Sequence, residues 1–139
     1  MIERTLALIK PDATGARNTG RIIDMVERAG LAIAAMRLVR LTRGQAAAFY
    51  SVHKGKSFYE PLLDFMASGT TVAVLLEGEN AVQTWRSLMG PTDSTRAPEG
   101  TIRKLYGTNA RLNAVHGSDS AEAAMQEAAF FFPGMDLAR

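Results

Sequence analysis

Short apolar stretches typical of buried strands alternate with amphipathic helical stretches along this chain of 139 residues. The strand-like stretches cover residues 5–9, 31–41, 70–76 and 112–116. The helical stretches cover residues 18–29, 42–52, 58–68, 80–89 and 119–129, and residues of N-cap type (Asn18, Thr42, Asn80, and Asp119 or Ser120) begin most of them. Because each apolar face must be buried against another element, this order constrains the fold more than any single motif does.

The order β-α-β-α-α-β-α-loop-β-α contains two βαβ-like halves. This order predicts the α+β class: a ferredoxin-like α/β sandwich, with a four-stranded antiparallel sheet and helices packed on it. Periodicity leaves the order of the strands undetermined. The loop at residues 90–100 is rich in Gly, Pro, Thr and Ser, and loops of that length are often functional. The length predicts one domain over residues 1–139.

Composition excludes several classes of function. The chain has no cysteine, which rules out disulfides, cysteine zinc sites and thiol nucleophiles, and suits a reducing compartment. The net charge is only +2 and no run of Lys or Arg appears, so we expect no nucleic-acid partner. The first apolar run ends at Lys10-Pro11, too early for a signal peptide or a membrane span. We therefore expect a soluble cytoplasmic protein with no membrane partner.

The most informative local feature is His116, which directly precedes Gly117-Ser118-Asp119. Glycine leaves the backbone open, and Ser and Asp can begin a helix whose amide groups attract anions. The imidazole could therefore stand at the mouth of an anion site. A histidine that is simply hydrogen-bonded at a strand end is an equally good interpretation of these residues alone. The second histidine, His53, falls in a loop with Lys54 and Lys56, and we interpret it as a surface residue.

Over essentially its full length the chain resembles the nucleoside diphosphate kinases. The motifs that carry the resemblance are Asn113-x-x-His116-Gly117-Ser118-Asp119, Ile9-Lys10-Pro11-Asp12, Gly90-x-Thr92, Gly100-Thr101-Ile102-Arg103, and Ser118-Asp119-Ser120 before a helix with Glu127. The resemblance implies transfer of the terminal phosphate of a nucleoside triphosphate such as ATP to a nucleoside diphosphate, with Mg²⁺ as cofactor. It also implies a homo-oligomer, either a tetramer, a hexamer or a dimer. Ser94 departs from the proline common in the family, in a loop that helps subunits contact one another.

The resemblance implies that His116 is a nucleophile that carries the phosphate between the two half-reactions of a ping-pong mechanism. A neutral imidazole, with a pKa of about 6.5, has a free lone pair near pH 7. By the same resemblance, Glu127 orients the imidazole and Tyr50 steadies that carboxylate. Without the resemblance, Glu127 would be interpreted as a solvated helix residue and Tyr50 as an aromatic at the edge of the core.

Lys10, Arg86 and Arg103 match the phosphate-facing positions of the family, and Thr92 adds a neutral donor. Phosphoryl transfer relies on positioning and positive charge, and the planar fork of arginine donates two hydrogen bonds to one phosphate. The chain has no Walker-type glycine loop, so a phosphate site here is built in another way. In isolation, the two arginines would be interpreted as ordinary surface charges.

For the nucleoside, the resemblance implies that the base stacks on Phe58 beside Leu62, and that Asn113 and Lys10 bind the sugar hydroxyls. Because every base has a π face, we expect broad base tolerance. Core packing is the plainer interpretation of Phe58 and Leu62. The sequence has no metal-ligand cluster, so Mg²⁺ is expected on the phosphates, with Asp119 reaching it through water.

Two other classes of function compete with the kinase. Ferredoxin-like domains also serve as RNA-binding or ligand-sensing modules, but the strands offer mainly Leu, Ala, Val and Ile and no set of exposed aromatics. A histidine phosphocarrier, which hands phosphate to a protein, is the other alternative. Failure to discharge onto any nucleoside diphosphate would distinguish it.

Overall fold

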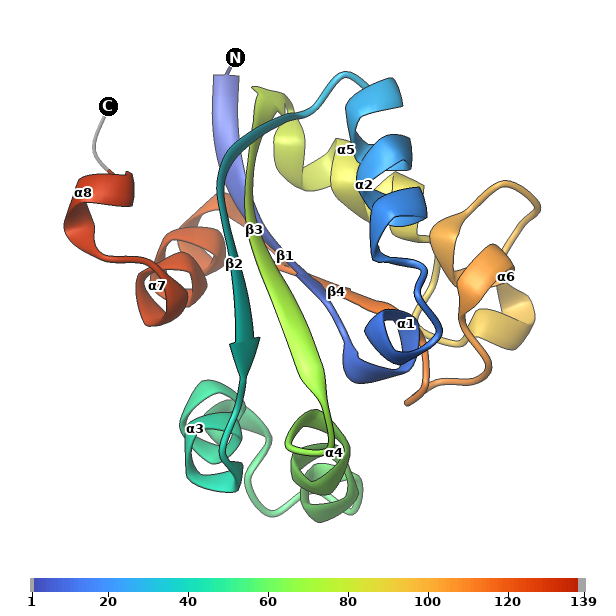
Figure 1. The fold of residues 1–139 in the computed structure, drawn as a ribbon, viewed down its shortest axis with the longest axis vertical. Helices are drawn as coiled ribbons and strands as arrows, with labels where there is room; N and C mark the ends of the chain where they lie inside the picture. Colours follow the sequence, from blue (N-terminus) through green and yellow to red (C-terminus); the bar gives the residue numbers. More distant parts are fainter. Residues whose placement is uncertain (1, 138–139) are drawn as a thin grey trace.

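The computed structural model describes residues 2–137, with residues 135 and 136 described by their backbone alone. Four strands form one antiparallel sheet in the order β2-β3-β1-β4 (Figure 1). They are β1 (Ile2–Ile9), β2 (Ala32–Arg40), β3 (Thr70–Glu79) and β4 (Val115–Gly117). The long central strands β1 and β3 pair along their whole length, whereas β4 pairs only with the last third of β1. The predicted four-stranded antiparallel sheet is confirmed.

Helices cover both faces of this sheet (Figure 1). They are α1 (Pro11–Gly15), α2 (Thr19–Arg28), α3 (Arg43–Phe49), α4 (Tyr59–Met66), α5 (Ala81–Met89), α6 (Ile102–Tyr106), α7 (Ala121–Phe131) and α8 (Gly134–Leu137). Figure 1 shows α1, α2, α5 and α6 on one side of the sheet, α7 and α8 on the other, and α3 and α4 at its lower end. Short 3₁₀ turns occur at Ser51–His53 and Ser94–Arg96.

Two apolar clusters hold these layers together. Alternate residues of β1 point to opposite faces, so Leu6 and Leu8 enter one cluster while Ala7 and Ile9 enter the other. The first cluster packs against α3, α4 and α7, and the second, which contains the fully buried Trp85, packs against α1, α2, α5 and α6. The sandwich is therefore built on a sheet whose central strand β1 is apolar on both faces, as β-strands between two helical layers are.

The structure differs from the sequence-based expectation mainly around residues 10–15 and 112–117. The predicted end of the first strand at Lys10-Pro11 is correct, but Pro11 also begins α1, because proline suits the first position of a helix. The strand predicted over residues 112–116 is wrong at its start: pairing covers only residues 115–117. The reason is Ala114, whose φ of 71° takes the chain out of extended conformation just before β4.

The predicted helix starts are confirmed in position, but not all of them are capped as expected. Thr42 forms a complete capping box with Gln45, and the hydroxyl of Ser120 accepts a hydrogen bond from the amide of Ala123. The side chains of Asn18 and Asn80 accept no such bond. At α5, the carboxylate of Glu3 accepts from the amide of Val82 instead, so a cap comes from β1, far away in the sequence.

Candidate active site

His116 lies in the middle of β4, opposite Leu8 of β1, and α7 passes over it with Glu127. Nε2 of His116 is 2.7 Å from Oε1 of Glu127, and the hydroxyl of Ser118 donates to the same oxygen at 3.2 Å. A carboxylate beside Nε2 favours the tautomer with its proton on Nε2, which leaves the lone pair on Nδ1. Within residues 2–137, Nδ1 makes no hydrogen bond. The His116 side chain is 23% exposed, so a ligand can reach it.

Aromatic rings surround the imidazole on its other sides. The rings of Phe49 and Tyr50 meet it edge-on, with centroids 5.6 and 6.1 Å away. The hydroxyl of Tyr50 is buried and has no hydrogen-bond partner among the described residues. Burial and the charge of Glu127 raise the pKa of this hydroxyl, so it stays protonated. The structure thus brings Tyr50 beside His116 but contains no hydrogen bond from Tyr50 to Glu127.

Lys10, Asn113 and Thr92 form a connected polar group beside the sheet end. Nζ of Lys10 donates to Oδ1 of Asn113 at 2.8 Å, and Nδ2 of Asn113 donates to the carbonyl of Thr92 at 3.0 Å. Burial, helped by the nearby charge of Arg103, lowers the pKa of Lys10 to about 8. Lys10 and Asn113 are both buried, with 6% and 3% of their surface exposed, so little of either side chain is accessible before a ligand binds.

Arg103 is buried, which distinguishes it from an ordinary surface charge. Its Nε, Nη1 and Nη2 donate to the carbonyls of Asn113, Gly90 and Val115 at 3.3, 2.9 and 2.9 Å. Burial and the charge of Arg86 lower its pKa to about 10, so the guanidinium remains charged near neutrality. Arg103 therefore holds the loop of residues 90–100 (the 90s loop) against the segment before His116. Two of its five N–H groups make no hydrogen bond within the described residues and remain for a ligand.

Arg86 and Asp119 lie nearer the surface. Nη1 of Arg86 is 2.7 Å from Oδ1 of Asp119, whose side chain is 88% exposed. No group of three or more His, Cys, Asp or Glu side chains able to hold a metal occurs in the part of the chain that the structure describes. A single exposed carboxylate fits a Mg²⁺ ion bound chiefly through phosphates, because Mg²⁺ keeps several waters and takes one or two carboxylates.

Phe58 is half-exposed at the start of α4, and Leu62 is buried one turn further along the helix. His53, expected at the surface, is partly exposed but makes contacts that the sequence did not indicate. Its ring stacks on Tyr50 at 6.3 Å and meets Phe58 edge-on at 5.2 Å, and its Nδ1 is 3.3 Å from Nζ of Lys56. Burial, Lys56 and the nearby His116 lower the pKa of His53. The three-residue spacing from Tyr50 is the sequence signal that points to this contact.

Sequence reasoning also missed two residues that support the segment 113–117. The indole N–H of Trp85 donates to the carbonyl of His116 at 3.2 Å, and a side chain at Gly117 would collide with the Trp85 ring. The carboxylate of Asp12 accepts from the amide of Ala114 at 3.0 Å. No local pattern marks either contact, because the partners lie far apart in the sequence.

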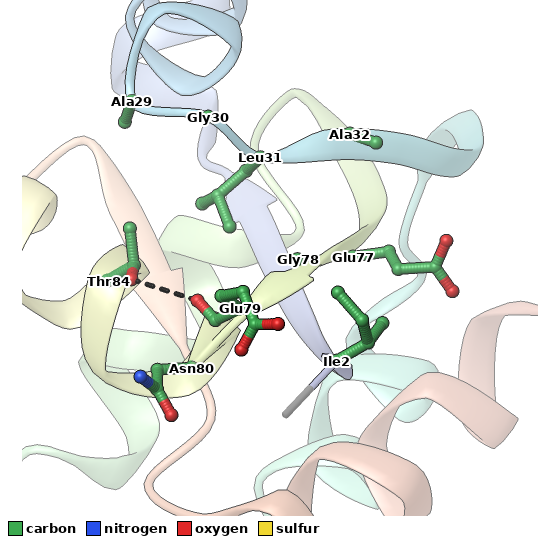
Figure 2. A pocket seen from close by; sticks show the side chains of 10 residues that line it. All are labelled: Ile2, Ala29, Gly30, Leu31, Ala32, Glu77, Gly78, Glu79, Asn80 and Thr84. Carbon is green, nitrogen blue, oxygen red and sulfur yellow. Dashed lines mark hydrogen bonds between the residues drawn. The ribbon is translucent and has the colours of Figure 1, made fainter.

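A surface hollow at the opposite end of the sheet contains none of these residues. Its walls come from the turn after α2 and from the end of β3, and Figure 2 shows Leu31 pointing into it with Glu77 and Glu79 at its rim. Glu77 is held by Arg4 at 2.9 Å, and the carbonyl of Glu79 accepts from the hydroxyl of Thr84. The cluster around His116 is therefore the better candidate for chemistry.

The order of the strands, the His116–Glu127 pair and the nearby cations Lys10, Arg86 and Arg103 are together those expected of an α+β domain that handles phosphate. Comparison with known proteins agrees: residues 3–137 match the family model of the nucleoside diphosphate kinases. The chain is 54% identical to the nucleoside diphosphate kinase of Psychromonas ingrahamii, over 94% of this chain and 91% of that one. The Nitrobacter hamburgensis enzyme is 51% identical, over 98% and 97%.

Solved structures are similar as well. The Aquifex aeolicus nucleoside diphosphate kinase superposes with a TM-score of 0.94 at 40% identity, covering 98% of this chain and 99% of that one. The Halobacterium salinarum enzyme, solved in complex with CDP, gives 0.91 at 36% identity, covering 95% and 88%. The chain belongs to the nucleoside diphosphate kinase family. It is a phosphotransferase that moves phosphate from a nucleoside triphosphate to a nucleoside diphosphate.

Proposed function

We propose that His116 carries the transferred phosphate and that its Nδ1 is the attacking atom. The observation that supports this is the contact of Nε2 with Glu127, which leaves Nδ1 with a lone pair. In the first half-reaction Nδ1 forms a bond to the γ-phosphorus, while the bond to the β–γ bridging oxygen breaks and the nucleoside diphosphate leaves. In the second, a terminal β-phosphate oxygen of another nucleoside diphosphate forms a bond to this phosphorus, while the P–N bond breaks and its electron pair returns to Nδ1. Glu127 stabilises the positive charge on the ring while the phosphate is attached.

The cations are proposed to bind the phosphates. Arg86 and the free N–H groups of Arg103 suit the equatorial oxygens, where charge is spread in the transition state. Lys10 adds a second buried positive charge, and the hydroxyl of Thr92 donates from the 90s loop. The hydroxyl of Tyr50, buried beside the imidazole without a partner in the described residues, is proposed to steady Glu127 or to donate to the bound phosphate.

The nucleoside is proposed to stack on Phe58 beside Leu62, with its sugar hydroxyls bound by Asn113 and Lys10. The exposed ring of Phe58 and the hydrogen-bonded Lys10–Asn113 pair support this placement. Stacking discriminates weakly between bases, so kcat/KM for GDP, CDP and dTDP is expected to agree within about tenfold. The CDP bound by the Halobacterium salinarum enzyme is consistent with this tolerance.

Mg²⁺ is the proposed cofactor, bound mainly by the substrate phosphates, with Asp119 reaching it through water. When bound, the ion neutralises phosphate charge. The chain's own contribution is the pair Arg86–Asp119, which holds the carboxylate at the rim of the site. We further propose that residues 1–139 form one domain, that the protein is cytoplasmic, and that it is a homo-oligomer. No helix among residues 2–137 is both long and apolar enough to cross a membrane.

A two-step labelling experiment tests the proposal. The protein is incubated with Mg·ATP labelled on the γ-phosphate, and free nucleotide is removed. We expect label that acid removes and base does not, and that leaves as GTP when GDP is added. The His116→Ala variant should take up no label while still binding nucleotide. Normal turnover by His116→Ala would overturn the assignment of the nucleophile, and label that GDP cannot discharge would indicate a phosphocarrier.

A further inference from the structure

Ala114, two residues before His116, has a backbone conformation that alanine rarely adopts. Its φ is 71°, in the left-handed region where the side chain crowds the backbone. The amide of Val115 donates to the carbonyl of Asn113 at 2.8 Å, the bond that closes a γ-turn around Ala114. The γ-turn with positive φ is the rarer and more strained of the two forms. Such strain persists only where the surroundings hold it, and it concentrates at functional sites.

The residues that follow β1 hold Ala114 from both sides. The amide of Lys10 donates to the carbonyl of Ala114 at 2.8 Å, and the amide of Ala114 donates to Oδ2 of Asp12 at 3.0 Å. Asp12 lies in the first turn of α1, and its backbone is anchored there by the helix. The carboxylate is half-buried, so its bond to Ala114 is poorly screened by water.

This turn determines how two proposed ligand groups lie relative to each other. Asn113 is the first residue of the turn, and its amide side chain bonds Nζ of Lys10 and the carbonyl of Thr92. If Ala114 relaxed to negative φ, the Asn113 side chain would move relative to Lys10, because Asn113 belongs to the turn whereas Lys10 follows β1. Misplacement of about 1 Å in a positioned group is enough to cost large factors in rate.

We infer that Asp12 is a positioning residue: by holding Ala114 in the left-handed γ-turn, its carboxylate places Asn113 and Lys10 against the sugar of the nucleotide. The inference rests on the proposed sugar contacts of Asn113 and Lys10. It predicts a property that general destabilisation does not change, namely how strongly the enzyme prefers a nucleotide with sugar hydroxyls over one without them.

The test compares kcat/KM for GDP and for 2′,3′-dideoxy-GDP, with ATP as donor. In Asp12→Ala, kcat/KM should fall about tenfold or more for GDP but much less for the dideoxy substrate. The ratio of kcat/KM for GDP to that for dideoxy-GDP therefore falls toward one. The double variant Asp12→Ala/Ala114→Gly should recover much of the ratio, because glycine adopts positive φ without strain. Asp24→Ala is the matched control: that carboxylate pairs with Arg28 on the exposed side of α2, and the ratio should stay at the wild-type value.

Two outcomes would overturn the role of Asp12: an unchanged ratio in Asp12→Ala, or a double variant no better than the single one. Asn113→Ala separates this from the proposed sugar site. If the ratio falls in Asn113→Ala but not in Asp12→Ala, only the positioning role of Asp12 is contradicted. If the ratio is unchanged in Asn113→Ala, the proposed sugar contact and this inference are both overturned. If Asp12→Ala does not fold, Asp12→Asn and Asp12→Asn/Ala114→Gly replace the pair, because a neutral amide accepts more weakly than a carboxylate.

Discussion

Nε2 of His116 and Oε1 of Glu127, 2.7 Å apart, join the edge strand β4 to the last long helix. The hydroxyl of Ser118 donates to the same oxygen, so the carboxylate is held in place by a neighbour as well as by its helix. Both side chains are about three-quarters buried, at 23% and 26% exposure, which strengthens their interaction relative to one in water. The ring is therefore oriented before a nucleotide arrives.

Replacing Glu127 by Gln should lower kcat more than it changes KM. The amide oxygen can still accept from Nε2, but the charge that stabilises a phosphorylated, cationic ring is lost. Hydrogen bonds to a charged partner are worth about 1.5–3 kcal/mol, so we expect a fall in kcat of about 10- to 100-fold. Stopped-flow measurement of the first half-reaction with ATP checks this. Glu122→Gln, in the exposed first turn of α7, is the control and should react at the wild-type rate.

Replacing Lys10 by Met should inactivate the enzyme yet stabilise the fold at neutral pH. Burial lowers the pKa of Lys10 to about 8, so the folded state gives up this proton more readily than the unfolded state. Below pH 8 both states are charged and the folded state carries the full penalty, on the order of 3 kcal/mol. As pH rises from 8 toward the ordinary lysine pKa, the wild-type protein regains that free energy.

The stability difference between Lys10→Met and the wild-type protein should therefore be largest at pH 7 and shrink at higher pH. Urea denaturation at pH 7 and 9.5 measures it. Part of the gain at pH 7 is offset by the loss of the hydrogen bond from Lys10 to Asn113. A difference that stays constant with pH would contradict the lowered pKa.

Trp85→Phe should destabilise the protein without abolishing activity. Phenylalanine fills most of the buried space but cannot donate to the carbonyl of His116, so this part-buried hydrogen bond is lost. A hydrogen bond of this kind contributes about 0.5–1.5 kcal/mol, and the smaller ring adds a cavity. Denaturation followed by circular dichroism measures the loss. We expect kcat to fall less than about tenfold, because Glu127 still orients the ring; a protein as stable as the wild type would exclude a structural role for this bond.

Ser94→Pro should raise the stability of the chain by about 0.5–1 kcal/mol. Ser94 begins the 3₁₀ turn Ser94–Arg96, its hydroxyl is buried without a partner in the described residues, and its amide makes only a long bond of 3.5 Å to Asn109. Asp93 before it is extended, as a residue preceding proline must be. The melting temperature checks this. Thr95→Pro is the control and should destabilise, because the Thr95 amide donates to Asp93 at 3.0 Å.

Much of the fold could be predicted because its signals are local. The apolar run of residues 70–76 became β3, extended to Glu79, and the capping residues Thr42 and Ser120 began helices where expected. The boundaries that failed were those decided by tertiary contacts. The helix expected over residues 42–52 ends at Phe49, where the chain continues as the 3₁₀ turn that carries His53 toward Phe58.

For the candidate site, the residue types and their order came from the sequence motifs, but their partners did not. Arg103 was expected to face phosphate, and the structure shows that three of its nitrogens also anchor backbone carbonyls. His53 was expected at the surface, and its partly exposed ring also stacks on Tyr50. A sequence motif identifies a side chain, whereas the hydrogen-bond partners of that side chain depend on which distant segments lie next to it in the folded protein.

The sequence by itself determined the class of fold and the chemical groups that converge near His116, because hydrophobic period, caps and motif spacing are properties of neighbouring residues. Only the tertiary structure decided that Ala114 would be strained, because the bond that holds it comes from Asp12, 102 positions earlier. Likewise, only folding brought the indole of Trp85 to the carbonyl of His116. Such contacts carry no periodic signal, since they exist only once the sheet has brought the end of β1 beside β4.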